Sequence, residues 1–249
     1  MRVTRVHVDA PLVTGTLLAL PDGAAQHVSR VLRLGAGAPL KLFNGAGGEY
    51  EATIETARRN DVVVRVGAHD ATERESPLRI TLLQGLARGE KMDLILQKAT
   101  ELGVTGVVPV QMARSTVRLD ARNAEARQRH WQSVVISACE QCGRNTIPMV
   151  SPPCAFQQSL TLSGSHKLML APDDGALSLV EWAATAPLAD PAALVSILVG
   201  PEGGFDAAET AAAIAAGFTS CRLGPRILRT ETAGLAALAA LQSLAGDLR

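Results

Sequence analysis

The chain has 249 residues, of which 47% are hydrophobic, 19% charged and 3% aromatic, a composition that excludes an intrinsically disordered protein. No apolar run approaches the roughly 20 residues of a membrane-spanning helix, and the N-terminus lacks a signal-peptide core, so we expect a cytoplasmic protein. The 24 basic and 24 acidic residues balance overall. Residues 76–150, however, hold 10 basic and 6 acidic residues, which is typical of either a polyanion-binding surface or a solvated helix face.

The first seventy residues carry the pattern of a small β-barrel. Short runs rich in Val, Leu and Thr alternate with Gly, Pro and Asn turns, as in barrels built from several short strands. One helix interrupts them, with Asp22 as its expected N-cap. Its apolar side should consist of Ala25, Val28, Val31 and Leu32. The predicted strands span residues 4–8, 15–20, 40–43, 50–56 and 62–66, with turns at Asn44-Gly45 and Asn60-Asp61.

The polar, aperiodic residues 71–77 end in proline and form the best candidate for a linker. They divide the β-rich residues 1–70 from residues 78–249, in which apolar strand-like runs alternate with helical patterns. That alternation predicts an α/β domain with a parallel sheet covered on both faces. Its predicted strands span residues 78–86, 104–110, 167–170, 194–199 and 218–223, and its predicted helices residues 90–102, 122–142, 176–182, 206–216 and 230–244.

Cys139 and Cys142 form a CxxC pattern inside the predicted helix over residues 122–142. A structural zinc ion needs four ligands, and the chain has no second pair with metal-ligand spacing. We therefore expect reduced thiols in the core and no metal.

Three loops of the second half follow predicted strands, and ligands of parallel α/β sheets bind beyond the carboxyl ends of the strands. Residues 199–204 contain three glycines with Pro201 and Glu202, and glycines let a ligand approach the backbone closely. A tight turn would need only one of them, which favours a binding loop. Residues 223–230 place Ile227 and Leu228 in a polar loop before Thr230, the expected N-cap of the last helix. The third loop, residues 170–175, consists of ordinary turn residues.

The two apolar residues of the second loop have two interpretations that the sequence leaves equal. Ile227 and Leu228 either wall a flat heteroaromatic ring or fold back onto the core. Familiar devices are absent: the chain has no GxxxxGK[ST], GxGxxG, HExxH or GxSxG motif. These absences disfavour NTPases, nicotinamide dehydrogenases, zinc proteases and serine hydrolases.

Five blocks of residues occur in order along nearly the whole chain. They lie at residues 27–33 (HVSRVLR), 91–104, 138–148, 200–205 (GPEGGF) and 226–233 (RILRTETA). Together they resemble the RsmE-type ribosomal RNA methyltransferases of the SPOUT superfamily, which modify the N3 position of a uridine in the 16S rRNA of the small ribosomal subunit. The last two blocks are the most specific.

The resemblance implies a PUA-like, RNA-binding β-barrel domain followed by a SPOUT domain with a C-terminal trefoil knot. It also implies a homodimer, S-adenosyl-L-methionine as cofactor and the small ribosomal subunit as partner. The knot loops of the family hold the cofactor. By residue match they contribute Leu170, Ala171, Val199, Gly200, Pro201, Glu202, Gly203, Gly204, Leu223, Gly224, Ile227, Leu228 and Thr230.

Uracil N3 carries a proton, so its methylation needs a base or nearby positive charge. Within this resemblance Arg229 is the candidate for electrostatic stabilisation, and Glu231 and Glu202 are the candidate bases. Alternatively, Arg229 forms a helix-terminus salt bridge with Glu231, whose charge then simply favours the helix dipole.

Arginines and lysines dispersed over a surface suit contacts to the RNA backbone. We expect phosphate contacts from Arg30 and Arg33 in the barrel domain, and from a second set on the central surface of the dimer: Arg88, Lys91, Arg114 and Arg144. With seven aromatic residues in the chain, base stacking falls chiefly to Phe205 and Tyr50. Two other functions compete: a non-catalytic RNA-binding ribosome-assembly factor, and a SPOUT methyltransferase acting on tRNA.

Overall fold

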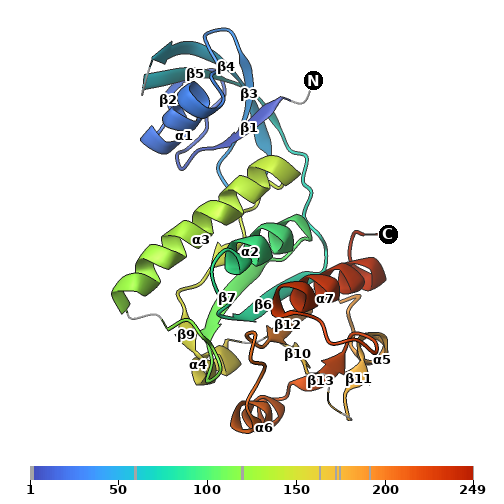
Figure 1. Ribbon diagram of the computed structural model, residues 1–249. Helices are drawn as coiled ribbons and strands as arrows, with labels where there is room; N and C mark the ends of the chain where they lie inside the picture. The colour runs from blue at the N-terminus through green and yellow to red at the C-terminus, as the bar shows by residue number, and fades with distance from the viewer. Residues whose placement is uncertain are drawn as a thin grey trace. The chain divides into compact units, whose positions relative to one another are not determined.

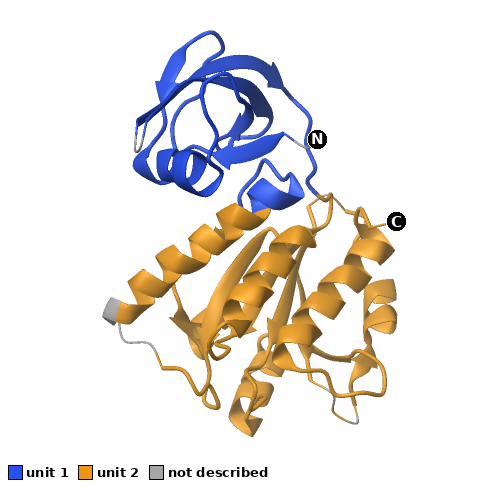
Figure 2. Cartoon of the chain, turned by 45° about the horizontal axis from the view of Figure 1, so that its top comes forward, with its two compact units in different colours: residues 1–75, 139–147 blue, residues 76–138, 148–249 orange. Residues whose placement is uncertain are grey.

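The computed structural model describes residues 3–58, 61–118, 121–162, 164–171, 173, 175–190 and 192–248, without the side chains of residues 121 and 122. Asn60 of one predicted turn, and Pro172 and Asp174 of the third predicted loop, lie outside the described residues. The chain forms two units, shown in Figure 2: residues 1–75 with 139–147, and residues 76–138 with 148–249. The segment 139–147 is a part of unit 1 that the predicted division does not assign to it.

Unit 1 contains all five strands expected in the first seventy residues. They form one sheet of order β1-β3-β4-β5-β2, in which β1 and β3 pair in parallel and the other neighbours antiparallel. Alternate residues of β4 and β5, such as Ile54 and Val64, point to one side and are fully buried, as a half-buried strand requires. The strands are β1 (Thr4–His7), β2 (Leu17–Ala19), β3 (Pro39–Phe43), β4 (Glu49–Arg58) and β5 (Asp61–Asp70).

The expected helix of unit 1 is present, but two details of its prediction are wrong. It comprises α1 (Asp22–Gln26) and a π-helical continuation, η1 (His27–Val31). Its N-cap residue is Pro21, and Asp22 belongs to the first turn. Val31 is 68% exposed, although the 3.6-residue period places it on the apolar side. The wider π turn, in which the Leu32 N–H donates to the His27 carbonyl, rotates the later residues away from that side.

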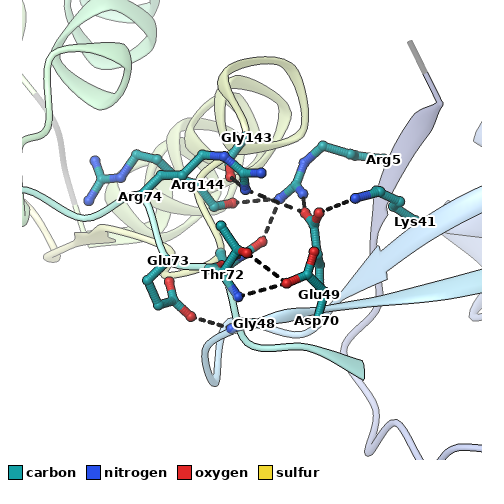
Figure 3. Close-up of polar contacts among 11 residues, drawn as sticks. Arg5, Lys41, Gly48, Glu49, Asp70, Thr72, Glu73, Arg74, Gly143 and Arg144 are labelled. Carbon is teal, nitrogen blue, oxygen red and sulfur yellow. Dashed lines mark hydrogen bonds and ion pairs between the residues drawn. The ribbon is translucent and has the colours of Figure 1, made fainter. Parts of the chain in front are cut away.

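A buried ionic cluster lies at one end of the unit 1 sheet (Figure 3). The Glu49 carboxylate on β4 is 1% exposed and forms ion pairs with Arg5, Lys41 and Arg74, the last at 3.6 Å. Arg5 also stacks its guanidinium over the Phe43 ring, 4.7 Å from the ring centroid. A buried carboxylate requires such compensation, because an unpaired charge removed from water is very costly.

The same cluster ties two further segments into unit 1. Arg5 donates to the Arg144 carbonyl at 2.9 Å and to the Asn145 side chain at 2.7 Å, and Asn145 donates to the Thr72 carbonyl at 2.8 Å. Arg144 itself is 4% exposed and pairs with Glu75. The prediction that Arg144 contacts RNA is therefore wrong, because its guanidinium is enclosed and already neutralised.

Unit 2 is the predicted α/β domain with a parallel sheet. The strand order is β11-β13-β10-β12-β6-β7-β8, with β9 also paired to β7, and every pair is parallel. The strands are β6 (Arg79–Gly85), β7 (Gly106–Gln111), β8 (Met149–Val150), β9 (Cys154–Ala155), β10 (His166–Leu170), β11 (Leu177–Ser178), β12 (Leu194–Val199) and β13 (Thr219–Arg222). All five predicted strands are present, whereas the two-residue strands β8, β9 and β11 were not predicted.

Helices cover both faces of this sheet. Leu83 on β6 packs with Phe156 of α4 and Ala213 of α6, whereas Leu82, its neighbour in the strand, faces Gly234 of α7 on the opposite side. Figure 1 shows α2 and α7 side by side. The helices are α2 (Lys91–Glu101), α3 (Ala121–Cys142), α4 (Phe156–Thr161), α5 (Leu179–Thr185), α6 (Ala207–Ala215) and α7 (Thr230–Ala245). Of these, only α4 was not predicted.

The structure also bears on the cysteines, on metal binding and on membrane spanning. All four cysteines are free, Cys139 being buried and Cys142 partly exposed. In the part of the chain that the structure describes, no group of three or more His, Cys, Asp or Glu side chains could hold a metal ion. Among the described helices, none combines the length and apolar character that crossing a bilayer requires.

Candidate functional site

Beyond the carboxyl ends of β10, β12 and β13, unit 2 contains a cavity of about 610 Å³. The glycine-rich loop over residues 199–205 and the arginine-bearing loop over residues 222–229 form its walls together with the end of β10. The expectation that these two loops lie side by side and enclose one crevice is confirmed. Six further residues line the cavity, of which Asp173 and Arg226 lie within predicted loops without an assigned role; the others are Thr210, Cys221, Arg222 and Ala233.

Eleven of the thirteen predicted cofactor residues line this cavity, as do the predicted catalytic residues Arg229, Glu231 and Glu202. The two exceptions are Gly203 and Gly224. Lys91, which was predicted to contact RNA, lines the cavity as well. The sequence gives no sign of this position, because a charged residue at the start of a helix is normally solvated.

A buried chain of hydrogen bonds holds the two loops together. The Gln84 side chain on β6 is fully buried and donates to Thr230 Oγ1 at 3.0 Å and to the Gly85 carbonyl at 3.1 Å. Thr230 Oγ1 in turn donates to the Gly200 carbonyl at 2.6 Å. A Cβ atom on Gly85 would lie 2.6 Å from the Pro201 nitrogen, so β6 and the glycine-rich loop pack backbone against backbone.

These bonds correct the role predicted for Thr230. Arg229 is the N-cap residue of α7, and Thr230 is its first helical residue. The Thr230 hydroxyl is engaged with Gly200 instead of capping its own helix. The corresponding prediction for α6 is confirmed, because Asp206 caps it in a capping box with Glu209.

The glycine-rich loop is also fixed from its outer side. Arg114, in the loop after β7, donates to the Gly203 carbonyl at 3.1 Å, and a Cβ atom on Gly203 would lie 2.8 Å from the Arg114 Cβ. The buried Glu209 carboxylate accepts the Ala113 N–H at 2.7 Å and the Asp206 N–H at 3.1 Å. Gly203 therefore permits the close approach of a neighbouring loop and, contrary to its predicted role, does not line the cavity.

Charged side chains meet at one wall of the cavity. Lys91 Nζ lies 3.4 Å from Glu202 Oε1 and 3.3 Å from Glu231 Oε2. Burial alone would raise the pKa of Glu202, but hydrogen bonds from the backbone N–H groups of Arg88 and of Glu202 itself, together with Lys91, outweigh burial and lower that pKa. Glu231 thus pairs with Lys91, and the alternative salt bridge with Arg229 is not formed. The Arg229 guanidinium has no hydrogen-bond or ion-pair partner among the described residues.

Another part of the cavity lining is apolar and has free peptide groups. Ile227 is 86% exposed, so the interpretation that it folds back onto the core is wrong, and it stands in the cavity wall with Leu223 and Leu228. Within the described ranges, the backbone groups of residues 224–228 make no hydrogen bonds. Burial raises the pKa of Cys221, on the cavity wall, to about 12, so its thiol stays protonated and is no nucleophile. The wall suits a flat ring that needs apolar contact and backbone hydrogen bonds.

Of the predicted RNA contacts, the remaining arginines are exposed in the unit to which each belongs. Arg30 lies in η1, and Arg33 follows it with a left-handed φ of 54°. Arg88 lies between β6 and α2, and Arg114 projects from the loop after β7.

Comparison with known proteins identifies the family. A family model described as an RNA methyltransferase domain matches residues 74–242, and one described as an RNA methyltransferase PUA domain matches residues 20–67. The ribosomal RNA small subunit methyltransferase E of Buchnera aphidicola is 30% identical over 249 residues, covering 100% of this chain and 96% of that protein. The chain belongs to the ribosomal RNA small subunit methyltransferase E family. The Bacillus subtilis member is 32% identical over 218 residues, covering 86% of this chain and 85% of its own.

Solved structures support the same family. The ribosomal RNA small subunit methyltransferase E of Neisseria gonorrhoeae, solved bound to S-adenosyl methionine, is 39% identical, with a TM-score of 0.92 and full coverage of both chains. A Legionella pneumophila protein solved with its bound cofactor SAM is 38% identical, with a TM-score of 0.94 and full coverage of both chains. The resemblance to the methyltransferase E family and the PUA domain predicted from the sequence are both confirmed.

Proposed function

We propose that this member of the methyltransferase E family transfers a methyl group from S-adenosyl-L-methionine to the N3 position of a uridine in the 16S rRNA of the small ribosomal subunit. The observation that carries the proposal is the cavity between the two loops, at the edge of a parallel sheet where such folds bind ligands. Relatives 38% and 39% identical over their full length were solved with this cofactor bound.

The residues present fit this cofactor. The cavity of about 610 Å³ lies in the usual range for a ligand of that size, about 300–1,000 Å³. The free peptide groups of residues 224–228 and the side chains of Leu223, Ile227 and Leu228 suit the adenine ring, and the loop over residues 199–204 encloses the remainder. When bound, S-adenosylmethionine supplies a methyl group already activated on a sulfonium, so the protein has mainly to align a nucleophile with it.

The charged residues of the cavity can accept the N3 proton and stabilise the charge on the uracil. N3 must lose its proton as it forms the bond to the methyl carbon, and that proton needs an acceptor. Glu202 Oε1 already accepts the backbone N–H of Arg88 at 3.1 Å, whereas Glu231 Oε2 accepts no hydrogen bond among the described residues. We therefore assign the proton to the Glu231 carboxylate. Arg229, which is exposed and unpaired among the described residues, stabilises the negative charge that develops on the uracil.

Several coarser features complete the proposal. Unit 1, with Arg30 and Arg33, holds the RNA, and unit 2 carries catalysis; the predicted domains at residues 1–70 and 78–249 are kept as the core of each. The active form is a homodimer, which sedimentation would detect as twice the mass of the chain. The protein works in the cytoplasm. The C-terminal part is a SPOUT trefoil knot, which the family resemblance implies; the crossover of the chain from β13 to α7, which packs on β12 and β6, is compatible with that topology. In optical tweezers a knotted chain would gain less contour length than its residue number predicts.

The decisive experiment incubates the protein with small ribosomal subunits from a strain lacking the modification and with methyl-labelled cofactor. We expect label in 16S rRNA and, by mass mapping, 3-methyluridine at one position. Label in tRNA instead would support the tRNA methyltransferase. RNA binding without cofactor binding or label would support the assembly factor. Arg30→Ala should weaken RNA binding and reduce its salt dependence, while cofactor affinity measured by calorimetry stays unchanged.

A further inference from the structure

The Lys91 ammonium is paired with two carboxylates, whereas a lysine that binds RNA phosphates would be expected to point into solvent. Lys91 is the first residue of α2, and its ammonium lies between Glu202, in the loop after β12, and Glu231, in the first turn of α7. We propose that Lys91 is a positioning residue of the active site, which holds the Glu231 carboxylate at the cavity wall, and that it makes no contact with the RNA backbone. This inference rests on the proposed function, because Glu231 is assigned there as the proton acceptor.

The two carboxylates depend on Lys91 to different degrees. Glu202 Oε1 also accepts the backbone N–H of Arg88 at 3.1 Å, so it keeps an anchor without the lysine. Glu231 Oε2 is buried and has no hydrogen-bond partner in the described part of the chain, which leaves the Lys91 ammonium at 3.3 Å as its compensation. A carboxylate oxygen removed from water needs such a counter-charge to remain in place. Loss of Lys91 should therefore displace Glu231 far more than Glu202.

The other charged groups of the cavity do not substitute for Lys91. They are Asp173, Arg222, Arg226 and Arg229. Arg222 is engaged with the Ala176 carbonyl, and none of the three arginines forms an ion pair with Glu231 among the described residues. Among the described residues, Lys91 is thus the side chain that links α2 to the carboxylate that accepts the proton.

A phosphate contact and a positioning role predict opposite results for Lys91→Met. Loss of one phosphate contact reduces the slope of log K against log salt for RNA binding by about 0.7 to 0.9. A positioning role leaves RNA affinity and that slope unchanged and lowers kcat at least about 10-fold, a part of the 10²–10⁴-fold that a positioned base contributes. Cofactor affinity, measured by calorimetry, should stay within about 3-fold of the wild type.

Lys98→Met is the matched control, because Lys98 lies on the same helix, pairs with Glu101 and does not line the cavity. It should change neither kcat nor the salt slope. Lys91→Arg keeps the positive charge and should recover part of kcat. In the double variant Lys91→Met with Glu231→Gln, kcat should equal that of Glu231→Gln alone, because a residue that acts through another adds nothing once its target is gone.

Three results would overturn the inference: a shallower salt slope with unchanged kcat, an unchanged kcat with an unchanged slope, or losses that multiply in the double variant. Failure of the proposed function is seen separately, as a wild-type protein that methylates no RNA. The salt slope needs no methyl transfer, so it would reveal a phosphate contact of Lys91 in that case as well.

Discussion

The hydroxyl of Thr230 links the two loops that form the cavity. It donates to the Gly200 carbonyl at 2.6 Å and accepts from the Gln84 amide at 3.0 Å, so Thr230→Val removes both bonds while keeping the shape of the side chain. The Gly200 carbonyl would have no other donor among the described residues, and a buried acceptor left unsatisfied costs about 1 to 3 kcal/mol. Gln84 retains its bond to Gly85, so the second loss adds about 1 kcal/mol.

Thr230→Val should therefore lower the free energy of unfolding by about 2 to 4 kcal/mol, which in a chain of this length lowers Tm by about 4 to 16 °C. Scanning calorimetry with and without cofactor measures the effect, and titration calorimetry should show weaker cofactor binding, because Gly200 and Thr230 anchor the two loops. Thr230→Ser keeps the hydroxyl and should lose no more than about 1 kcal/mol. A valine variant as stable as the serine variant, with wild-type cofactor affinity, would refute the reasoning.

Three further predictions concern other parts of the molecule. Gly203→Ala should lower the free energy of unfolding by about 1 to 3 kcal/mol, because its new methyl group collides with the loop after β7; an unchanged urea midpoint contradicts this. Glu49→Gln leaves a buried arginine without its counter-charge and should cost about 3 to 5 kcal/mol in urea titration, whereas Glu55→Gln, which breaks an exposed pair, should cost less than about 1 kcal/mol. Burial raises the pKa of Cys139 and Cys221 to about 12, so both thiols should remain unlabelled by iodoacetamide at pH 8 until the chain unfolds; rapid native labelling of either, seen by mass spectrometry, contradicts this.

The position of the cavity could be predicted because it depends on local signals. A strand that runs into several glycines and then into a capping box marks the edge of a parallel sheet, and residues 194–209 carry all three signals in succession. The loop before α7 could be placed for the same reason. What the local pattern cannot give is the partner of each side chain. Gly203 and Thr230 were assigned to the ligand and to a cap, and both instead face another segment of the protein.

The charged residues were the hardest to place, because their partners are distant in sequence. Lys91 pairs with residues more than a hundred positions away, and Arg144 with Glu75, so no spacing rule distinguishes either from a solvated surface charge. The same applies to residues 139–147, which belong to unit 1 through hydrogen bonds to Arg5 and Thr72. The strands β8 and β9 were missed for a simpler reason: two residues are too few to show a period.

The two loops of the cavity differ in how firmly the protein holds them. Thr230 fixes Gly200 from within, Arg114 fixes Gly203 from outside, and Glu209 fixes the start of α6 and the loop after β7 together. Residues 224–228, in contrast, make no backbone hydrogen bonds among the described residues and expose Ile227. The glycine-rich loop is thus preorganised, so a ligand loses little affinity to ordering it, and the ordering cost of binding falls on residues 224–228. Thr230, the first residue of α7, is already held to Gly200, so Glu231 next to it keeps its place while residues 224–228 adjust to the ligand.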